Sequence, residues 1–122
     1  MIGFTGEDER PRTRRLWDVV VVGAGPAGAV VARELALAGA TVLLVDRRRF
    51  PRNKVCGGCL SARTVEQLGQ LGLDRAINQL GGKALHRLKL GGWGHLVSLP
   101  LPGGISISRS ALDAALVNAA LA

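Results

Sequence analysis

The apolar positions in the first third of the chain predict a strand, a helix and a second strand. Leu16 to Val22 is a nearly continuous apolar run rich in valine, which is typical of a parallel strand covered on both faces. Apolar residues then repeat at helical spacing, at Val30, Val31, Leu35 and Ala38. Gly39 is a suitable helix stop, and Thr41 to Val45 forms the next apolar run. Two strands joined in this way pair in parallel through a right-handed crossover, so the pattern predicts an α/β fold.

The middle of the chain changes to shorter elements. Arg47 to Leu60 is rich in Pro, Gly and charge and is therefore predicted to be a loop. Ser61 is a suitable N-cap for a helix that runs to about Leu71. Gly72 interrupts this helix, and Leu73 to Leu80 is expected to form a second short one.

The last third is predicted to contain a hairpin, a short strand and a helix. Ala84 to Leu101 consists of two short alternating runs separated by Gly91-Gly92-Trp93-Gly94, which indicates a β-hairpin. Ile105 to Ser108 is a third short strand. Ser110 to Ala122 is expected to be a helix, because Ser110 and Asp113 resemble a capping box at its start.

The first fifteen residues lack any hydrophobic period. Residues 1–15 are polar and include Pro11 and the basic run Arg10–Arg15. We therefore expect a disordered basic arm over 1–15 and a single domain, or part of one, over 16–122. An alternative for the basic run is contact with anionic lipid, that is, peripheral contact with a membrane.

The composition limits the partners and the compartment. The net charge of +7 favours an anionic partner, but only two Trp and two Phe accompany it, so a base-stacking surface for nucleic acid is not expected. Two cysteines and no signal peptide indicate a reducing compartment. No run approaches the roughly 20 apolar residues of a membrane span. We therefore expect a cytoplasmic protein, either soluble or peripheral to the membrane.

The turn after the first strand carries the clearest chemical signal. Gly23, Gly25 and Gly28 have G-x-G-x-x-G spacing, which permits a tight turn, close approach of a pyrophosphate and close helix–sheet packing. Asp46 ends the next strand, where a carboxylate can accept hydrogen bonds from a ribose. Together these features predict a dinucleotide site on a Rossmann-like βαβ unit. The alternative is an ordinary set of packing glycines.

Three segments together resemble the flavoprotein family of geranylgeranyl reductases, flavin-dependent halogenases and aromatic-ring hydroxylases. The first is the dinucleotide segment, residues 21–46. The second is the loop F-P-R-x-K-x-C-G-G, residues 50–58. The third is S-R-x-x-L-D, residues 108–113. The loop with Lys54 and Cys56 is most similar to the geranylgeranyl reductase branch.

The resemblance implies that this segment binds FAD. The pyrophosphate would be held by the glycine turn, that is, by Gly23, Ala24, Gly25, Pro26, Ala27 and Gly28. Asp46 would bind the adenosine ribose and disfavour a 2′-phosphate by charge repulsion, although Arg47 keeps NADP from being excluded outright. Lys54, Cys56, Gly57 and Arg109 would contact the cofactor. Because members of this family are much longer, the resemblance also implies an incomplete domain, an N-terminal fragment of the enzyme.

Cys56 has several alternative interpretations. The resemblance implies a position beside the flavin and the substrate, and therefore a catalytic role. Cys56 and Cys59 also form a C-x-x-C, which could carry thiol–disulfide chemistry because Arg52 and Lys54 provide cations. A structural cysteine without chemistry is a third option. Zinc would need His86 and His95 as additional ligands, so no metal is expected.

The function that the resemblance implies is reduction of prenyl-chain double bonds by an FAD-dependent oxidoreductase. The substrate would then be a prenyl lipid or another small molecule, and NAD(P)H is one candidate for the electron donor, which the sequence does not identify. One alternative is a flavin monooxygenase or halogenase that acts on an aromatic ring. An alternative of another class is a non-catalytic nucleotide-binding module or an inactive fragment.

Overall fold

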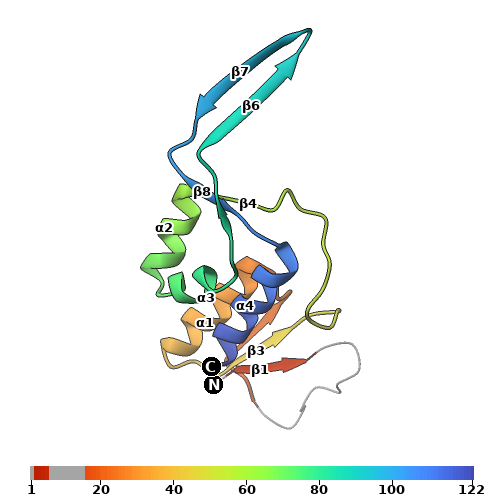
Figure 1. Ribbon diagram of the computed structural model, residues 1–122. Coiled ribbons are helices and arrows are strands. Elements are labelled where there is room, and N and C mark those ends of the chain that lie inside the picture. Colours follow the sequence, from red (N-terminus) through yellow and green to blue (C-terminus); the bar gives the residue numbers. More distant parts are fainter. Residues whose placement is uncertain (1, 6–15) are drawn as a thin grey trace. The chain divides into compact units, whose positions relative to one another are not determined.

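The computed structural model describes residues 2–5 and 16–122. The chain divides into two compact units (Figure 1). The first consists of Met1–Val55 with Arg109–Ala122, and the second of Cys56–Ser108. The first unit is therefore assembled from two segments that lie far apart in the sequence.

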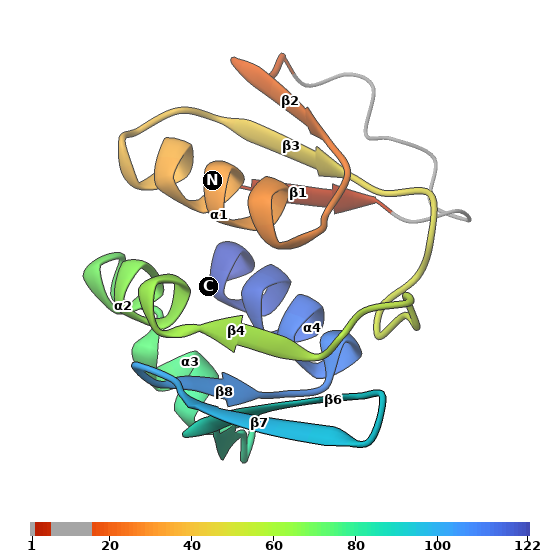
Figure 2. The same ribbon diagram turned by 90° about the horizontal axis from the view of Figure 1, so that it is seen from above.

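The first unit contains a parallel sheet with two helices on one side. Its strands are β1 (Ile2–Thr5), β2 (Val19–Val22) and β3 (Val42–Val45), in the order β1-β3-β2. Helix α1 (Pro26–Leu37) connects β2 to β3, and α4 (Arg109–Leu121) packs beside α1 (Figure 2). The predicted βαβ unit is thus present, with Val19 opposite Val42 and Val22 opposite Val45 in parallel register.

The core of this unit lies between the sheet and the helices. Its buried apolar residues are Ala24, Ala29, Ala32, Val42, Leu44, Leu112, Leu116, Val117 and Ala120. Side chains alternate between the two faces of a strand, and in β2 the outward-facing Val20 and Val22 are 54% and 83% exposed. The expectation that this strand is covered on both faces is therefore wrong for the described residues, because both helices pack on the same face.

The N-terminal segment also departs from the expectation. Ile2–Thr5 forms β1, with Ile2 opposite Val42 and Thr5 opposite Val45. These four residues belong to the arm expected over 1–15, and pairing with β3 gives their backbone groups a parallel partner. The remainder of that arm, including the basic run Arg10–Arg15, lies outside the described residues.

A polar clamp joins the beginnings of β2 and β3. The Oδ2 of Asp18 accepts hydrogen bonds from the backbone N–H and the hydroxyl of Thr41, both at 2.7 Å. The backbone N–H of Asp18 donates to the carbonyl of Thr41 at 2.9 Å. The two hydrogen bonds that Thr41 donates to the carboxylate lower the pKa of Asp18, the one from the Thr41 side chain most of all.

The second unit contains two short helices and two antiparallel sheets. Helices α2 (Ala62–Gln70) and α3 (Asp74–Asn78) lie where the pattern predicts them, and the Ser61 hydroxyl caps α2 by accepting from the Thr64 N–H at 3.2 Å. Strands β4 (Cys59–Ser61), β8 (Gly104–Ser106) and β5 (Lys83–Ala84) form one sheet. Cys59 and Leu60 were expected in a loop, but they pair with Ser106 and Ile105.

The predicted hairpin is present as β6 (Arg87–Gly92) and β7 (His95–Pro100). Trp93 and Gly94 form its two-residue turn with positive φ values of 48° and 79°, as type I′ hairpin turns require. Every residue of both strands is exposed.

Helix α4 begins differently from the prediction. It starts at Arg109, so Ser110 lies within the first turn instead of capping it. The carboxylate of Asp113 is also unavailable for a capping box, because its Oδ1 accepts a hydrogen bond from Arg109 Nε at 2.6 Å. The expected capping box is therefore wrong.

Candidate functional site

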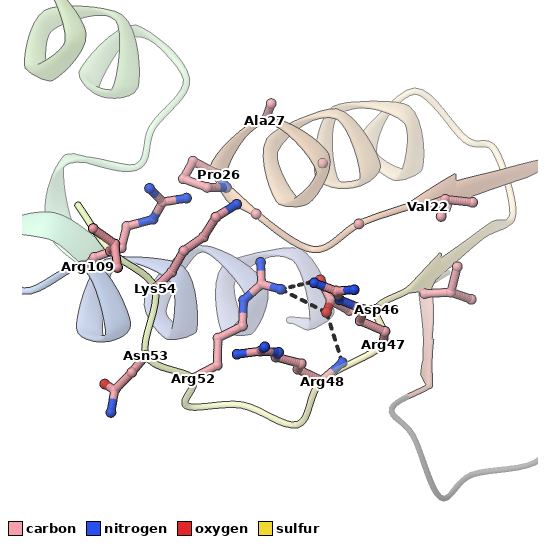
Figure 3. A pocket seen from close by; sticks show the side chains of 15 residues that line it. Val22, Pro26, Ala27, Asp46, Arg47, Arg48, Arg52, Asn53, Lys54 and Arg109 are labelled. Carbon is pink, nitrogen blue, oxygen red and sulfur yellow. Dashed lines mark hydrogen bonds and ion pairs between the residues drawn. The ribbon is translucent and has the colours of Figure 1, made fainter.

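A cleft of about 1120 Å³ opens in the first unit where β2 and β3 end and α1 begins (Figure 3). Ligands of open α/β sheets bind at this carboxyl end of the strands. The cleft is lined by residues of the glycine turn, the end of β3, the following loop and α4. These are Val22, Gly23, Gly25, Pro26, Ala27, Gly28, Val45, Asp46, Arg47, Arg48, Arg52, Asn53, Lys54, Val55 and Arg109.

The glycine turn brings the backbone close to the cleft. Gly23 has φ +102°, a conformation that residues with a side chain rarely adopt. A Cβ on Gly28 would lie 1.8 Å from the carbonyl oxygen of Gly23, so the first turn of α1 can pack on the strand only with glycine here. Gly25 is the N-cap, and no side chain in the described part of the chain caps this helix. The first N–H groups of α1 are therefore available to a ligand, and an anion is favoured there.

Asp46 ties the loop after β3 to the glycine turn. Its Oδ2 accepts from the Ala24 N–H at 2.8 Å, and its Oδ1 accepts from the Arg48 N–H at 3.0 Å. The Nη1 of Arg52 lies 2.8 Å from each of the two oxygens. The Asp46 side chain is only 3% exposed. The predicted ribose acceptor thus lies in the cleft wall, where Arg52 shares its carboxylate.

A second carboxylate lies behind the two arginines of the cleft. Asp113 has no exposed side-chain surface, and its Oδ1 holds Arg109 while its Oδ2 lies 3.6 Å from Arg52 Nε. At 3.6 Å this last contact is an ion pair and not a hydrogen bond. Arg52 Nε and Asp113 Oδ2 accordingly have no hydrogen-bond partner within residues 2–5 and 16–122. The cleft therefore contains one continuous network of alternating negative and positive side chains, in the order Asp46, Arg52, Asp113 and Arg109.

The structure brings together most of the residues predicted for the cofactor. The cleft is lined by Gly23, Gly25, Pro26, Ala27, Gly28, Asp46, Arg47, Lys54 and Arg109. Ala24 is buried beneath the turn and takes part through its N–H. Cys56 and Gly57 belong to the second unit and are not among the lining residues.

The motifs indicated Arg52 as a loop cation near the cysteines, and they left both Arg52 and Asp113 without a role in cofactor binding. The signal that could have revealed them is charge: Asp113 is an acid on the apolar face of a helix, and a buried acid needs a cation. Arg48, Asn53 and Val55 also line the cleft, but no sequence feature distinguishes them from other loop residues.

The cysteines of the C-x-x-C are both exposed, and neither is part of a disulfide. The Gly58 N–H lies 3.5 Å from Cys56 Sγ, and Cys59 Sγ lies 3.4 Å from the carbonyl oxygen of Gly57. In the described part of the chain, no three His, Cys, Asp or Glu residues gather as metal ligands. The catalytic role of Cys56 stays a prediction.

A sequence profile described as the FAD binding domain matches residues 17–92. The chain belongs to this FAD binding domain family. The match contains the glycine turn, Asp46 and the loop with Arg52 and Lys54. The cleft fits the anionic part of FAD, because the first turn of α1 and two guanidinium groups surround a site where Gly25 has no side chain.

The curated relatives of this FAD binding domain include reductases. Menaquinone reductase of Mycobacterium tuberculosis (strain H37Rv) is 44% identical over 103 residues, which are 79% of this chain and 24% of the relative. Digeranylgeranylglycerophospholipid reductase 1 of Methanopyrus kandleri is 48% identical over 54 residues, 43% of this chain and 14% of the relative. The chain thus spans about a quarter or less of the length of these relatives.

Solved flavoproteins share the fold. A flavoprotein/dehydrogenase from Cytophaga hutchinsonii matches with a TM-score of 0.75 and 27% identity, over 86% of this chain and 28% of that one. The myxobacterial chondrochloren halogenase, an FAD-dependent halogenase, matches with a TM-score of 0.76 and 25% identity, over 86% of this chain and 26% of the halogenase. None of the helices in the described ranges is both long and apolar enough to cross a bilayer.

Proposed function

We propose that this FAD binding domain serves an oxidoreductase that uses reduced FAD to saturate double bonds in the prenyl chain of a lipid. The observation that carries the proposal is the 44% identity to a menaquinone reductase over 79% of the chain. It is supported by a second, shorter match to a digeranylgeranylglycerophospholipid reductase.

The chain's part in this function is to bind and orient the cofactor. The backbone N–H groups at the start of α1 would receive the pyrophosphate, together with Arg52 and Arg109. Lys54 extends toward Pro26 along the same cleft (Figure 3). Asp46 would accept hydrogen bonds from the adenosine ribose, sharing its carboxylate with Arg52. Bound FAD would supply the hydride chemistry.

A flavin-dependent monooxygenase or halogenase is the second candidate. The similarity to an FAD-dependent halogenase favours it. The two candidates differ in their use of oxygen, because a reductase transfers a hydride to carbon, whereas a monooxygenase or halogenase consumes O2.

Cofactor binding is tested with Gly25→Val. Any Cβ here lies 3.7 Å from Arg52 Nη2 and 3.9 Å from Arg109 Nη2, so the branched side chain fills the space between the guanidinium groups and the turn. We expect the purified protein to bind added FAD with a shifted flavin absorbance spectrum, and Gly25→Val to lose at least about tenfold in affinity. The matched control is Gly92→Val, because nothing lies within 4 Å of a Cβ at Gly92. Equal affinity of Gly25→Val and the unsubstituted protein would contradict the proposed position of the pyrophosphate.

The reaction is tested under anaerobic conditions with FAD and NADPH, NADH or dithionite as the electron donor. We expect menaquinone or a geranylgeranyl lipid to gain two hydrogens per reduced double bond, as measured by mass spectrometry. Oxygen consumption with an aromatic substrate, and no anaerobic product, would instead support the monooxygenase or halogenase.

A further inference from the structure

Asp113 is the most completely buried charged side chain described for the first unit, and the proposed binding of the cofactor leaves it without a role. It lies in α4, and its carboxylate has no exposed surface. A buried carboxylate is costly unless it is paired and hydrogen-bonded. Its two oxygens face Arg109 Nε at 2.6 Å and Arg52 Nε at 3.6 Å. Asp113 therefore holds Arg109 by a hydrogen bond and attracts Arg52, from another part of the chain, by an ion pair.

The outer edges of the same guanidinium groups converge on the glycine turn. The position of a Cβ on Gly25 lies 3.7 Å from Arg52 Nη2 and 3.9 Å from Arg109 Nη2. The two side chains are 12% and 21% exposed, so each can still meet a ligand in the cleft. A planar guanidinium held at Nε has a defined direction for its remaining N–H groups.

We propose that Asp113 is a positioning residue that aims Arg52 and Arg109 at the phosphates of the nucleotide bound over Gly25. This inference rests on the proposed function, namely nucleotide binding in the cleft. Asp113 is too deeply buried to touch the ligand and acts only through the two arginines. Arg52 also pairs with Asp46, the proposed ribose acceptor, through Nη1 at 2.8 Å, and this ion pair does not involve Asp113.

The direction in which the affinity for an anion changes when Asp113 is removed distinguishes a positioning role from simple charge neutralisation. If Asp113 only neutralised excess positive charge, its removal would make the cleft more positive and strengthen the binding of an anion. If Asp113 positions the arginines, its removal releases Arg109 and leaves Arg52 to its ion pair with Asp46, and phosphate binding weakens. A purely structural role would weaken binding of the whole ligand, including its adenosine part.

The experiment compares ADP, FAD and adenosine as ligands of Asp113→Ala by isothermal titration and competition. We expect the affinity for ADP and FAD to fall about tenfold or more, since charge-assisted hydrogen bonds are lost, and the affinity for adenosine to stay within about twofold. Asp113→Asn keeps an acceptor for Arg109 Nε and should lose less. Val117→Ala, which truncates another buried residue of α4, is the control and should leave all three affinities unchanged.

Unchanged or tighter ADP binding by Asp113→Ala, or an equal loss for ADP and adenosine, would overturn the inference alone. If the unsubstituted protein binds neither FAD nor ADP, the proposed function fails and the inference fails with it. If Asp113→Ala does not fold, Asp113→Asn is compared with and without Arg52→Ala and Arg109→Ala. Positioning predicts that Asp113→Asn weakens ADP binding only when the arginines are present, and an equal effect in both backgrounds would overturn it.

Discussion

Gly28 shows how a single hydrogen in place of a side chain sets the geometry of the cleft. A Cβ there would meet the Gly23 backbone oxygen at 1.8 Å and the Gly23 carbonyl carbon at 3.0 Å. Backbone atoms cannot move aside as the end of a flexible side chain can. The position therefore requires glycine because of the packing of α1 against the end of β2, independently of any ligand.

We expect Gly28→Ala to destabilise the protein by about 3 kcal/mol, at the upper end of the range for overpacking. The free energy of unfolding is measured by urea denaturation. Gly69→Ala is the control, because Gly69 lies in α2 with nothing within 4 Å of its Cβ position. This control should stabilise by about 0.5–1 kcal/mol through helix propensity. Similar stability of Gly28→Ala and the unsubstituted protein would contradict the close approach at Gly23.

Asp46 and Asp113, the two acids that pair with arginines in the cleft, differ in how well the sequence predicts their roles. Asp46 follows an apolar strand at a fixed interval from the glycine turn, so local spacing indicates its place in the cleft. Asp113 meets Arg109 within α4 itself, at i,i+4 spacing, but it reaches Arg52 only when the loop after β3 folds against α4. Spacing along the chain cannot reveal the pair of Asp113 with Arg52. The same limitation explains why Arg52 was predicted only as part of a loop motif.

At the scale of elements, the sequence predicted the strands that have apolar runs longer than four residues. It did not predict the short strands that form at the edge of a sheet. The helix capped by Ser61 and the hairpin around Trp93 follow from local signals, that is, a side-chain cap and a two-residue turn. Ile2–Thr5 has no such signal. It becomes a strand only through pairing with β3, about forty residues further along the chain.

The hydrogen bonds between Asp18 and Thr41, at the beginnings of β2 and β3, make the stability of the fold depend on pH. The pKa of Asp18 is lowered in the folded protein by hydrogen bonds from Thr41. Its contribution to stability is therefore present above the pKa of the unfolded chain, about 3.9, and is lost as the pH falls through the lower folded pKa. We expect Asp18→Ala to lower the urea midpoint at pH 7, and the difference from the unsubstituted protein to shrink below about pH 4. A difference that stays constant down to pH 2 would contradict this assignment.

The hairpin β6–β7 is amphipathic. Residues opposite each other in an antiparallel pair share a face, and Leu88–Leu99 and Leu90–Val97 are such pairs. These four side chains are 42–53% exposed and form an apolar face. The opposite face carries Arg87 and Lys89 together with Leu96, which is 68% exposed, and residues 83–108 contain no acid. An exposed apolar surface of this kind favours association.

We expect the apolar face to bind the dye ANS, and the double substitution Leu90→Glu with Val97→Lys to reduce its fluorescence. The pair keeps the register and places opposite charges across the strands, which is a favourable cross-strand arrangement. Ser98→Lys changes the other face and is the control. Undiminished ANS fluorescence in the double variant would show that the dye binds elsewhere.

At the scale of the whole molecule, the first unit depends on a helix contributed by the end of the described chain. Helix α4 contributes Leu112, Leu116 and Val117 to the buried core. At about 1.5–3 kcal/mol for each buried side chain, these three residues alone supply about 5–9 kcal/mol, comparable to the total stability of a domain. That residues 16–122 are part of one FAD-binding domain stays a prediction.

Deletion of Arg109–Ala122 is therefore expected to unfold the first unit and to abolish FAD binding, as measured by circular dichroism and flavin absorbance. The control replaces Arg87–Pro100 with Gly-Gly, since the Leu101 N–H already donates to the His86 carbonyl at 2.9 Å. This control removes the hairpin and should leave the first unit folded. A folded, FAD-binding product of the α4 deletion would contradict the importance of this helix.

The discontinuity of the first unit has a consequence for biosynthesis. A ribosome adds about 5–20 residues per second, so the 53 residues of Cys56–Ser108 take roughly 3–10 s to follow Val55 out of the peptidyl transferase centre. During that interval the nascent βαβ segment has its glycine turn but neither the apolar cover of α4 nor Arg109 and the Asp113 carboxylate that pairs with it. The cofactor site is therefore completed only after α4 leaves the exit tunnel, and until then α1 presents an uncovered apolar face to chaperones.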